Sequence, residues 1–306
     1  MHLIQVILMA IVQGLSEFLP ISSSAHLVLT SSFYKTFNDL ALSQDLNQEV
    51  FLDIMLHLGT LIAVLIYFRE DISKIIKAFR DSLKNKDYQN KDFKTGLYII
   101  LGTVISVAIA YPLNEIAGFL VFKPAIVGLL LVITGLFLLI SENIAKKVLN
   151  KKELNMKNSI LIAIAQGFAA LPGFSRSGLT IATGLLAGMD RVVAAKYSFL
   201  LSIPIILGSS MFYPLLELDL KEIVNYNWYA IIIGTIISGI VGYLCIKYFL
   251  KFVGKFSLAV FGYYCLIIGL FSFIFFIWYK NPRPLRERVE FLNELCEFRN
   301  SGEGLD

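Results

Sequence analysis

Six long apolar stretches set the strongest constraint on what this chain can fold into. They cover residues 51–68, 97–113, 122–141, 195–215, 228–249 and 257–279. A helix needs roughly 20 mostly apolar residues to cross a bilayer, and 97–113 is the shortest of the six. Charged residues make up 16% of the chain and its mean hydropathy is +0.71, against about 25% charged residues in ordinary soluble domains. The sequence therefore predicts an all-α polytopic membrane protein with about six transmembrane helices.

A short polar motif occurs twice among these stretches. The first copy begins at Ala10 and reads AIVQGLSEFLPISSSAH, and the second begins at Ala163 and reads AIAQGFAALPGFSRSGLT. Both contain Gln-Gly, then Leu-Pro, then a cluster of hydroxyl side chains with an ionisable residue. Proline lacks an amide proton and disfavours helix at the preceding residue, so Pro20 and Pro172 each predict a helix break. Ionisable residues inside apolar segments are costly, which makes both copies candidates for a functional site.

The charges in the loops predict the orientation of the chain. Basic residues concentrate in 69–94 and 146–157, and Lys247, Lys251 and Lys255 precede the last apolar stretch. The positive-inside rule places all three regions on the cytoplasmic side. A broken segment that enters and leaves the membrane on one face adds no crossing. The first half of the chain then crosses the membrane three times, so the second half has the opposite orientation in the membrane. The chain thus predicts two re-entrant helix-loop-helix elements in an inverted-topology repeat.

The same count predicts a single membrane domain over residues 1–279. Repeat 1 covers about 1–142, a cytoplasmic linker about 143–158 and repeat 2 about 159–279, and 280–306 form a C-terminal tail. The apolar N-terminus lacks a basic segment and a small-residue cleavage site, so it is expected to be retained rather than removed as a signal peptide. The three cysteines have no metal-ligand spacing. The net charge of +4 lies in the loops and indicates no nucleic-acid partner.

The first motif copy carries the residue types of an acid, a base and a nucleophile. Glu17 follows Gln13 by four residues, which places both on one helical face. It suits a metal ligand or a proton acceptor, and the alternative is a carboxylate that reaches toward the membrane interface. His26 follows Ser22 by four and Ser23 by three, so a helix that resumes after the break would put them on one face. A base beside a hydroxyl is the minimal unit for nucleophilic catalysis.

The second copy has the composition of an anion cradle. Glycines such as Gly173 allow unusual backbone angles and close approach, and a helix that resumes after the loop directs free N–H groups at an anion. Arg176 supplies a planar, permanently charged group suited to phosphate. The alternative is that Arg176 forms a structural salt bridge with Glu17. The hydroxyl donors of the cradle are Ser175, Ser177 and Thr180.

Other ionisable residues in the apolar stretches carry weaker signals. Asp53 could join Glu17 around a divalent ion, but an acid at the membrane interface explains its position better. His2 and His57 have no cluster of polar neighbours in the sequence, and both are expected to be structural.

With these motifs the chain resembles the undecaprenyl-diphosphate phosphatase family, the integral-membrane bacitracin-resistance phosphatases. The first family motif is matched by Gln13, Glu17, Leu19, Pro20, Ser22, Ser23 and His26. The second is matched in full by Pro172, Gly173, Ser175, Arg176, Ser177 and Thr180. The likeness covers roughly residues 1–279, and Gln13 stands where many members of the family carry Glu.

The resemblance implies removal of the terminal phosphate from undecaprenyl diphosphate, which regenerates the lipid carrier for peptidoglycan synthesis. It also implies a divalent cation, magnesium or calcium, with Glu17 as a ligand. The protein is expected in the bacterial inner (plasma) membrane as a multi-pass protein, surrounded by lipid, with its site open to the outer face. A homodimer is compatible with this expectation. The expected catalytic residues are Glu17, Ser23, His26 and Arg176, and the expected substrate-binding residues are Gln13, Ser22, Gly173, Ser175, Ser177 and Thr180.

The sequence leaves two mechanisms and a second function open. Ser23 can act as nucleophile with His26 as base, or water activated by Glu17 or His26 can attack directly. A transporter or flippase for an anionic lipid or a phosphorylated solute is the rival function, because inverted repeats with broken helices are typical of transporters. A purely structural membrane protein would leave the buried charges without a purpose.

Overall fold

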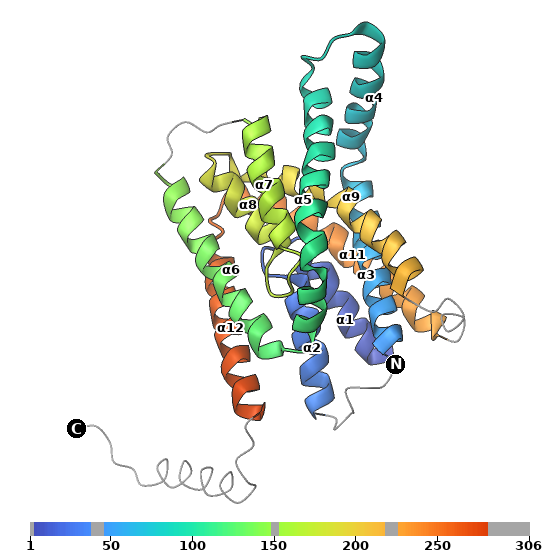
Figure 1. The fold of residues 1–306 in the computed structure, drawn as a ribbon, viewed down its shortest axis with the longest axis vertical. Coiled ribbons are helices and arrows are strands. Elements are labelled where there is room, and N and C mark those ends of the chain that lie inside the picture. Colours follow the sequence, from blue (N-terminus) through green and yellow to red (C-terminus); the bar gives the residue numbers. More distant parts are fainter. Residues whose placement is uncertain (1–2, 38–45, 148–152, 218–225, 281–306) are drawn as a thin grey trace, which may run out of the picture.

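The computed structural model describes residues 3–37, 46–147, 153–217 and 226–280 (Figure 1). Over these residues the regular structure is helical, and it comprises eleven helices. In chain order these are α1 (Leu3–Ser16), α2 (Ser23–Phe37), α3 (Leu46–Tyr67), α4 (Arg69–Asn85), α5 (Lys91–Val121), α6 (Pro124–Ala145), α7 (Met156–Phe168), α8 (Arg176–Leu186), α9 (Arg191–Glu217), α11 (Trp228–Val253) and α12 (Ala259–Lys280). The predicted tail lies outside the described residues apart from Lys280, the last residue of α12.

Six helices are long and apolar enough to cross a membrane, which confirms the predicted fold class. Their spanning portions are Val50–Tyr67, Lys91–Val121, Pro124–Ala145, Arg191–Met211, Trp228–Val253 and Ala259–Trp278. The prediction for 97–113 was too short, because α5 runs for 31 residues. The side chain of Asn90 accepts hydrogen bonds from the N–H groups of Asp92 and Phe93. This cap starts the helix in polar sequence before the apolar stretch begins.

Two pairs of short helices occupy the middle of the molecule. The pair α1 and α2 approaches from one end and the pair α7 and α8 from the other, so that their connecting loops meet (Figure 1). The four helices contain 14, 15, 13 and 11 residues, or roughly 16–22 Å of helix at 1.5 Å per residue. None is long enough to cross a hydrocarbon core of about 30 Å. That each pair enters and leaves a bilayer on one face stays a prediction.

The two connecting loops end the helices where the prolines predicted a break. Pro20 lies between α1 and α2, and Pro172 lies between α7 and α8. Ser22 has a φ of 71° and Gly173 a φ of 108°, both in the left-handed region that a right-handed helix cannot use. Gly173 also has no room for a side chain, because an added Cβ would lie 2.6 Å from the Cβ of Leu130.

The packing of the helices repeats between the two halves. Helix α1 packs on α11, and its counterpart α7 packs on α5, while α6 packs along α12. The α6–α12 pair is close because small residues face each other. A Cβ on Gly135 would lie 2.7 Å from the carbonyl oxygen of Gly262. Small residues that let backbones approach are typical of helix pairs in membranes.

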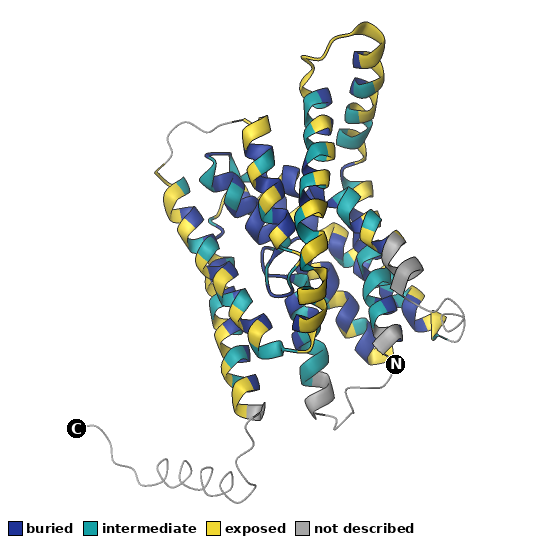
Figure 2. Ribbon diagram, in the orientation of Figure 1, coloured by how far each residue is buried: buried dark blue, intermediate teal, exposed yellow. Residues whose placement is uncertain are grey.

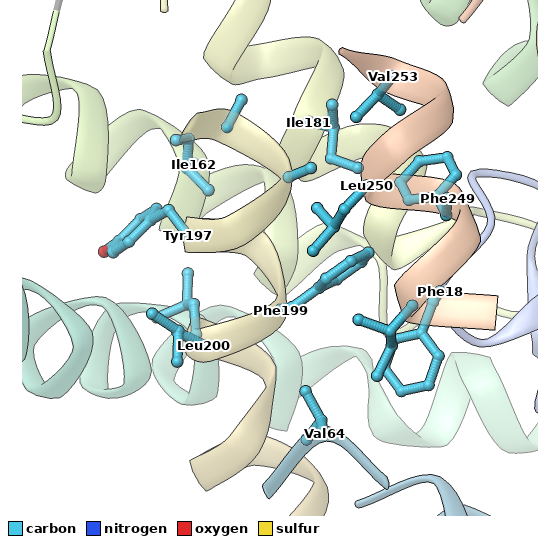
Figure 3. Close-up of a cluster of buried hydrophobic side chains, with 14 of the residues drawn as sticks. Phe18, Val64, Ile162, Ile181, Tyr197, Phe199, Leu200, Phe249, Leu250 and Val253 are labelled. Atoms are coloured by element: carbon cyan, nitrogen blue, oxygen red, sulfur yellow. The ribbon is translucent and has the colours of Figure 1, made fainter. Parts of the chain in front are cut away.

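A cluster of buried aromatic and aliphatic side chains lies beside the central loops (Figure 3). Phe18, fully buried, packs edge-on against Phe199 with 5.2 Å between ring centroids. The outer faces of the long helices are exposed instead (Figure 2). Apolar residues exposed there include Ile100, Val104, Ile133, Ile140, Ile267 and Ile274. Such continuous apolar surface is expected where hydrocarbon chains cover a protein.

The connections between the long helices lie at the two ends of the bundle. Helix α4 and the start of α5 project from one end, where α6 finishes and α7 begins, while the start of α1 and the end of α12 lie at the other (Figure 1). The projecting end carries the basic stretch 69–94. By the positive-inside rule we expect this end on the cytoplasmic side and the end that holds α1 and α2 on the outer side, and this orientation stays a prediction.

Candidate active site

The two motif copies meet at the tips of their helix pairs. The hydroxyl of Ser22 donates to the carbonyl oxygen of Phe174 over 3.1 Å. In return the hydroxyl of Ser177 donates to the carbonyl oxygen of Leu19 over 2.8 Å. Each loop thus satisfies a backbone acceptor of the other, and the polar side chains of both copies face one buried region. The structure therefore assembles one candidate site from residues far apart in the sequence.

Glu17 is at the centre of this site. It follows α1 directly, its side chain is 4% exposed, and its neighbour Phe18 anchors the loop in the apolar cluster. Its Oε2 accepts hydrogen bonds from Gln13 Nε2 at 2.9 Å and from Ser23 Oγ at 2.8 Å. The spacing of Gln13 and Glu17 on one helical face predicted the first contact. A buried carboxylate must be paired and hydrogen-bonded to be tolerated, and the surrounding donors meet that need.

Arg176 is the charged partner of Glu17. It is the first residue of α8, and its Nη2 donates to Glu17 Oε1. The side chain is 17% exposed, and its Nη1 is buried without a hydrogen-bond partner within the described part of the chain. The alternative weighed from the sequence, a salt bridge between these two residues, is therefore present. The free Nη1 shows that the guanidinium has donor capacity beyond this bridge.

The contacts of Ser23 and His26 differ from the prediction. The hydroxyl of Ser23 donates to Glu17, and no hydrogen bond links it to His26 among the described contacts. Because α2 begins at Ser23, the imidazole folds back over the first turn, and its Nδ1 lies 2.7 Å from the carbonyl oxygen of Ser22. The Ser23 hydroxyl and His26 thus have separate partners in this arrangement, and their pairing as nucleophile and base stays a prediction. Glu17 is the group placed to accept the proton of Ser23.

His26 has its second contact on the last helix. Its Nε2 lies 2.8 Å from the hydroxyl of Tyr264, which α12 contributes. The two rings stack with an interplanar angle of 10° and 5.6 Å between centroids. Nothing in the sequence connects these two residues.

His57 is a neighbour of the site that the sequence analysis missed. Its Nε2 lies 3.5 Å from Glu17 Oε2. Its Nδ1 lies 2.8 Å from the carbonyl oxygen of Asp53 and 3.4 Å from a carboxylate oxygen of the same residue. The expectation that His57 has no polar neighbours is therefore wrong, and its structural role stays a prediction. The available signal was an acid and a histidine four residues apart within one apolar stretch.

The remaining predicted substrate contacts have protein partners. Ser175 caps α8, since its hydroxyl accepts from the N–H of Gly178 at 3.0 Å. The hydroxyl of Thr180, fully buried, donates to the carbonyl oxygen of Arg176 at 2.7 Å. Ser22 caps α2 in the same way, accepting from the N–H of Ala25 at 3.2 Å. These hydroxyls shape the two loops, and their contact with a substrate stays a prediction.

The chemistry of the donors fits a hard cation that the substrate helps to bind. The carboxylate of Glu17 and the side-chain oxygen of Gln13 are oxygen ligands, and Gln13 Oε1 is buried without a hydrogen-bond partner among the described residues. Within the same residues there is no group of three or more His, Cys, Asp or Glu that could hold a metal. Magnesium is commonly bound by one or two carboxylates together with waters and substrate phosphates, so fewer than three ligating side chains are sufficient to bind it.

Comparison with known proteins gives one consistent family. Residues 6–271 match the family model described as Bacitracin resistance protein BacA. The undecaprenyl-diphosphatase of Methanobrevibacter smithii is 38% identical over 288 residues, which covers 90% of this chain and 98% of that protein. The protein of the same name from Halothermothrix orenii is 38% identical, with 90% and 98% coverage. Undecaprenyl-diphosphatase 1 of Pseudoalteromonas translucida is 35% identical, with 90% and 99% coverage. The chain therefore belongs to the BacA family of bacitracin resistance proteins.

Proposed function

We propose that this protein hydrolyses undecaprenyl diphosphate to undecaprenyl phosphate and inorganic phosphate. The observation that carries the proposal is the buried set of Glu17, Ser23 and Arg176, in which a carboxylate is bonded to both a hydroxyl and a guanidinium. The printed names of the relatives support the same reaction. A carrier of anions alone would need the arginine but not the hydroxyl placed on a carboxylate.

In this proposal Arg176 exchanges one anionic partner for another. Its guanidinium holds Glu17 when no substrate is bound, and a terminal phosphate offers oxygens that match its planar donors. As Arg176 turns to the phosphate, Glu17 loses the guanidinium and keeps the hydrogen bonds from Gln13 and Ser23, with His57 Nε2 still 3.5 Å away. The carboxylate becomes a stronger proton acceptor at the moment the substrate arrives. Phosphoryl transfer depends mainly on such positioning and charge stabilisation.

The attack then follows from the hydrogen bond between Ser23 and Glu17. Ser23 Oγ forms a bond to the terminal phosphorus, its proton passes to Glu17, and the bond from phosphorus to the bridging oxygen breaks. Undecaprenyl phosphate leaves. Water then attacks the phosphoserine and passes a proton to His26, the bond from phosphorus to Ser23 Oγ breaks, and Oγ takes back the proton held by Glu17 as phosphate is released. In the second route water takes the place of the serine hydroxyl and loses its proton to Glu17 or His26. The 2.8 Å contact between Ser23 and Glu17 favours the first route.

A divalent cation, magnesium or calcium, would supply charge neutralisation of the diphosphate oxygens when bound. Glu17 and Gln13 are the residues that would hold it. The amide oxygen of Gln13, which has no hydrogen-bond partner in the part of the chain that the structure describes, supports this assignment.

The surroundings of the site bear on location and partners. We place the protein in the inner membrane of a bacterium, with the site open to the outer face, because α1 and α2 enter from the end opposite the one that carries the basic stretch 69–94. Membrane lipid then covers the exposed apolar faces of α5, α6 and α12. A homodimer stays a proposal that size measurements in detergent can check.

The test uses purified protein in detergent with undecaprenyl diphosphate labelled on its terminal phosphate, and magnesium or calcium. Detergent micelles have no compartments, so release of labelled phosphate reports hydrolysis and not transport. We expect many phosphates per protein molecule. If no phosphate is released with either cation, while reconstituted vesicles translocate the intact lipid, the flippase alternative is correct.

A further inference from the structure

We infer that Tyr264 is a positioning residue for the reaction, and that its hydroxyl holds the Nε2 of His26 in place for proton transfer. The inference rests on the proposed phosphatase function. Tyr264 lies on α12, far in the sequence from both motif copies, and neither motif predicts a role for it. Its link to the site is the 2.8 Å contact between its hydroxyl and His26 Nε2.

The contacts of His26 define which nitrogen carries its proton. A carbonyl oxygen can only accept a hydrogen bond, so the 2.7 Å contact with Ser22 O requires a proton on Nδ1. In the neutral imidazole Nε2 then has a free lone pair. The Tyr264 hydroxyl can donate to that lone pair. The tyrosine thus occupies the one ring nitrogen of His26 that is free to exchange a proton with substrate.

The backbone of α12 is well placed to fix Tyr264. The neighbouring thiol of Cys265 donates to the carbonyl oxygen of Pro20 at 3.5 Å. One turn of helix from Cys265 on either side, Gly262 and Gly269 press against α6. An added Cβ would lie 2.8 Å from the Leu139 side chain at Gly262 and 2.6 Å from the carbonyl oxygen of Gly128 at Gly269. The helix therefore holds the loop of the first motif and the tyrosine ring in one rigid unit.

A positioned imidazole matters because proton transfer depends on geometry. A general acid or base must lie within hydrogen-bond reach of the atom that gains or loses the proton. Nearly parallel stacking of the two rings fixes the plane of the imidazole, and the hydroxyl fixes its rotation in that plane. When a water displaces the hydroxyl, Nε2 already points at the position the hydroxyl has left and can accept the proton of that water.

The test compares Tyr264→Phe, which keeps the stacked ring, with Tyr264→Leu, which removes ring and hydroxyl. Loss of one hydrogen bond predicts a fall in kcat of roughly 3- to 10-fold for Tyr264→Phe, with KM within about twofold of wild type. Tyr264→Leu should fall by no more than about twofold further. Tyr263→Phe is the matched control, since that side chain is the preceding residue on the same helix and is 59% exposed. It should leave kcat unchanged.

Three outcomes separate this inference from a packing role and from the function itself. If Tyr264→Phe matches wild type and only Tyr264→Leu loses kcat, the ring and not the hydroxyl matters, and the inference fails. In a His26→Ala background Tyr264→Phe should cause no further loss, whereas a full, independent loss would contradict the link to His26. If the His26→Ala variant has no detectable activity, the comparison of Tyr264→Phe with Tyr264→Leu decides whether the hydroxyl or the ring matters. Failure of the proposed function is distinct, because the wild-type protein would then release no phosphate.

Discussion

The ion pair between Arg176 and Glu17 yields the most quantitative prediction. Replacing Arg176 with alanine leaves the Glu17 carboxylate, 4% exposed, without its guanidinium partner, while His57 Nε2 stays 3.5 Å away. Removing one member of a buried pair costs about 3–5 kcal/mol of the free energy of unfolding. Gln13 and Ser23 still donate to the carboxylate, and each such bond is worth about 1 kcal/mol. We therefore expect a loss near the lower limit, about 3 kcal/mol, for Arg176→Ala.

A second substitution isolates the charge. In the double variant Glu17→Gln with Arg176→Ala, no uncompensated carboxylate remains, so about 2 of these 3 kcal/mol should return. Activity should not return with it, since both the phosphate ligand and the proton acceptor are gone. The double variant is thus expected to be more stable than Arg176→Ala because the unpaired charge is gone, and inactive because both functional groups are gone.

The assay is a denaturant titration in detergent. With Cys296 replaced by serine in every variant, the buried thiols of Cys245 and Cys265 provide the signal, because a thiol-reactive dye then labels the protein only after unfolding. Arg80→Ala is the matched control, since that arginine is 75% exposed on α4 and its ion pair should contribute little. If the double variant is no more stable than Arg176→Ala, the charge of Glu17 is not what destabilises the single variant. The proposal that Arg176 leaves Glu17 to bind the substrate phosphate, and so makes Glu17 a stronger proton acceptor, would then lose its support.

Three further predictions concern the loop, a second ion pair and the nucleophile. Gly173→Ala should lower the free energy of unfolding by about 1–3 kcal/mol because of its φ of 108°. The control Gly208→Ala should cause no such loss, since the added Cβ has open space around it. Equal losses in the two variants would contradict this reasoning. Arg191 donates to both oxygens of the buried Glu142, at 2.9 and 2.7 Å, so Arg191→Ala should cost about 3 kcal/mol in the same titration. Its kcat per folded molecule should stay within about twofold, and a larger fall would mean that this pair also acts in the reaction. Ser23→Ala should lower kcat by roughly 10³-fold or more in the phosphate assay if the hydroxyl attacks, and a variant that keeps most of its kcat would establish direct attack by water.

The fold class could be predicted from the sequence because it depends on the hydrophobicity of single continuous segments. A run of apolar residues long enough to span hydrocarbon must become a helix, since no other isolated segment satisfies its own backbone hydrogen bonds there. The same reasoning applies to Pro20 and Pro172, which end helices through their own covalent structure. The length of α5 was underestimated because its first turns are polar, and hydropathy alone does not mark a helix that continues outside the bilayer.

The composition of the site was harder to predict because its contacts join distant segments. The pairing of Gln13 with Glu17 was predictable from helical spacing, since both lie on one turn. The position of His57 beside Glu17 depends on how α3 packs against the first loop, and the contact of Tyr264 with His26 depends on α12. Residue spacing carries no information on either. The imidazole of His26 turned to a backbone carbonyl rather than to Ser23, a choice that only the loop geometry decides.

The most direct test of the account is the rate of phosphate release from undecaprenyl diphosphate by wild-type protein and by Arg176→Ala. Both are measured in detergent, with magnesium or calcium, in a single turnover at saturating protein. The account predicts one phosphate per lipid from the wild type. It predicts a rate lower by roughly 10³-fold for the variant, the scale of an arginine that stabilises a transferring phosphoryl group. A wild type that releases no phosphate, or a variant that releases it as fast as the wild type, would contradict the central claim that Arg176 binds the phosphate removed at this site.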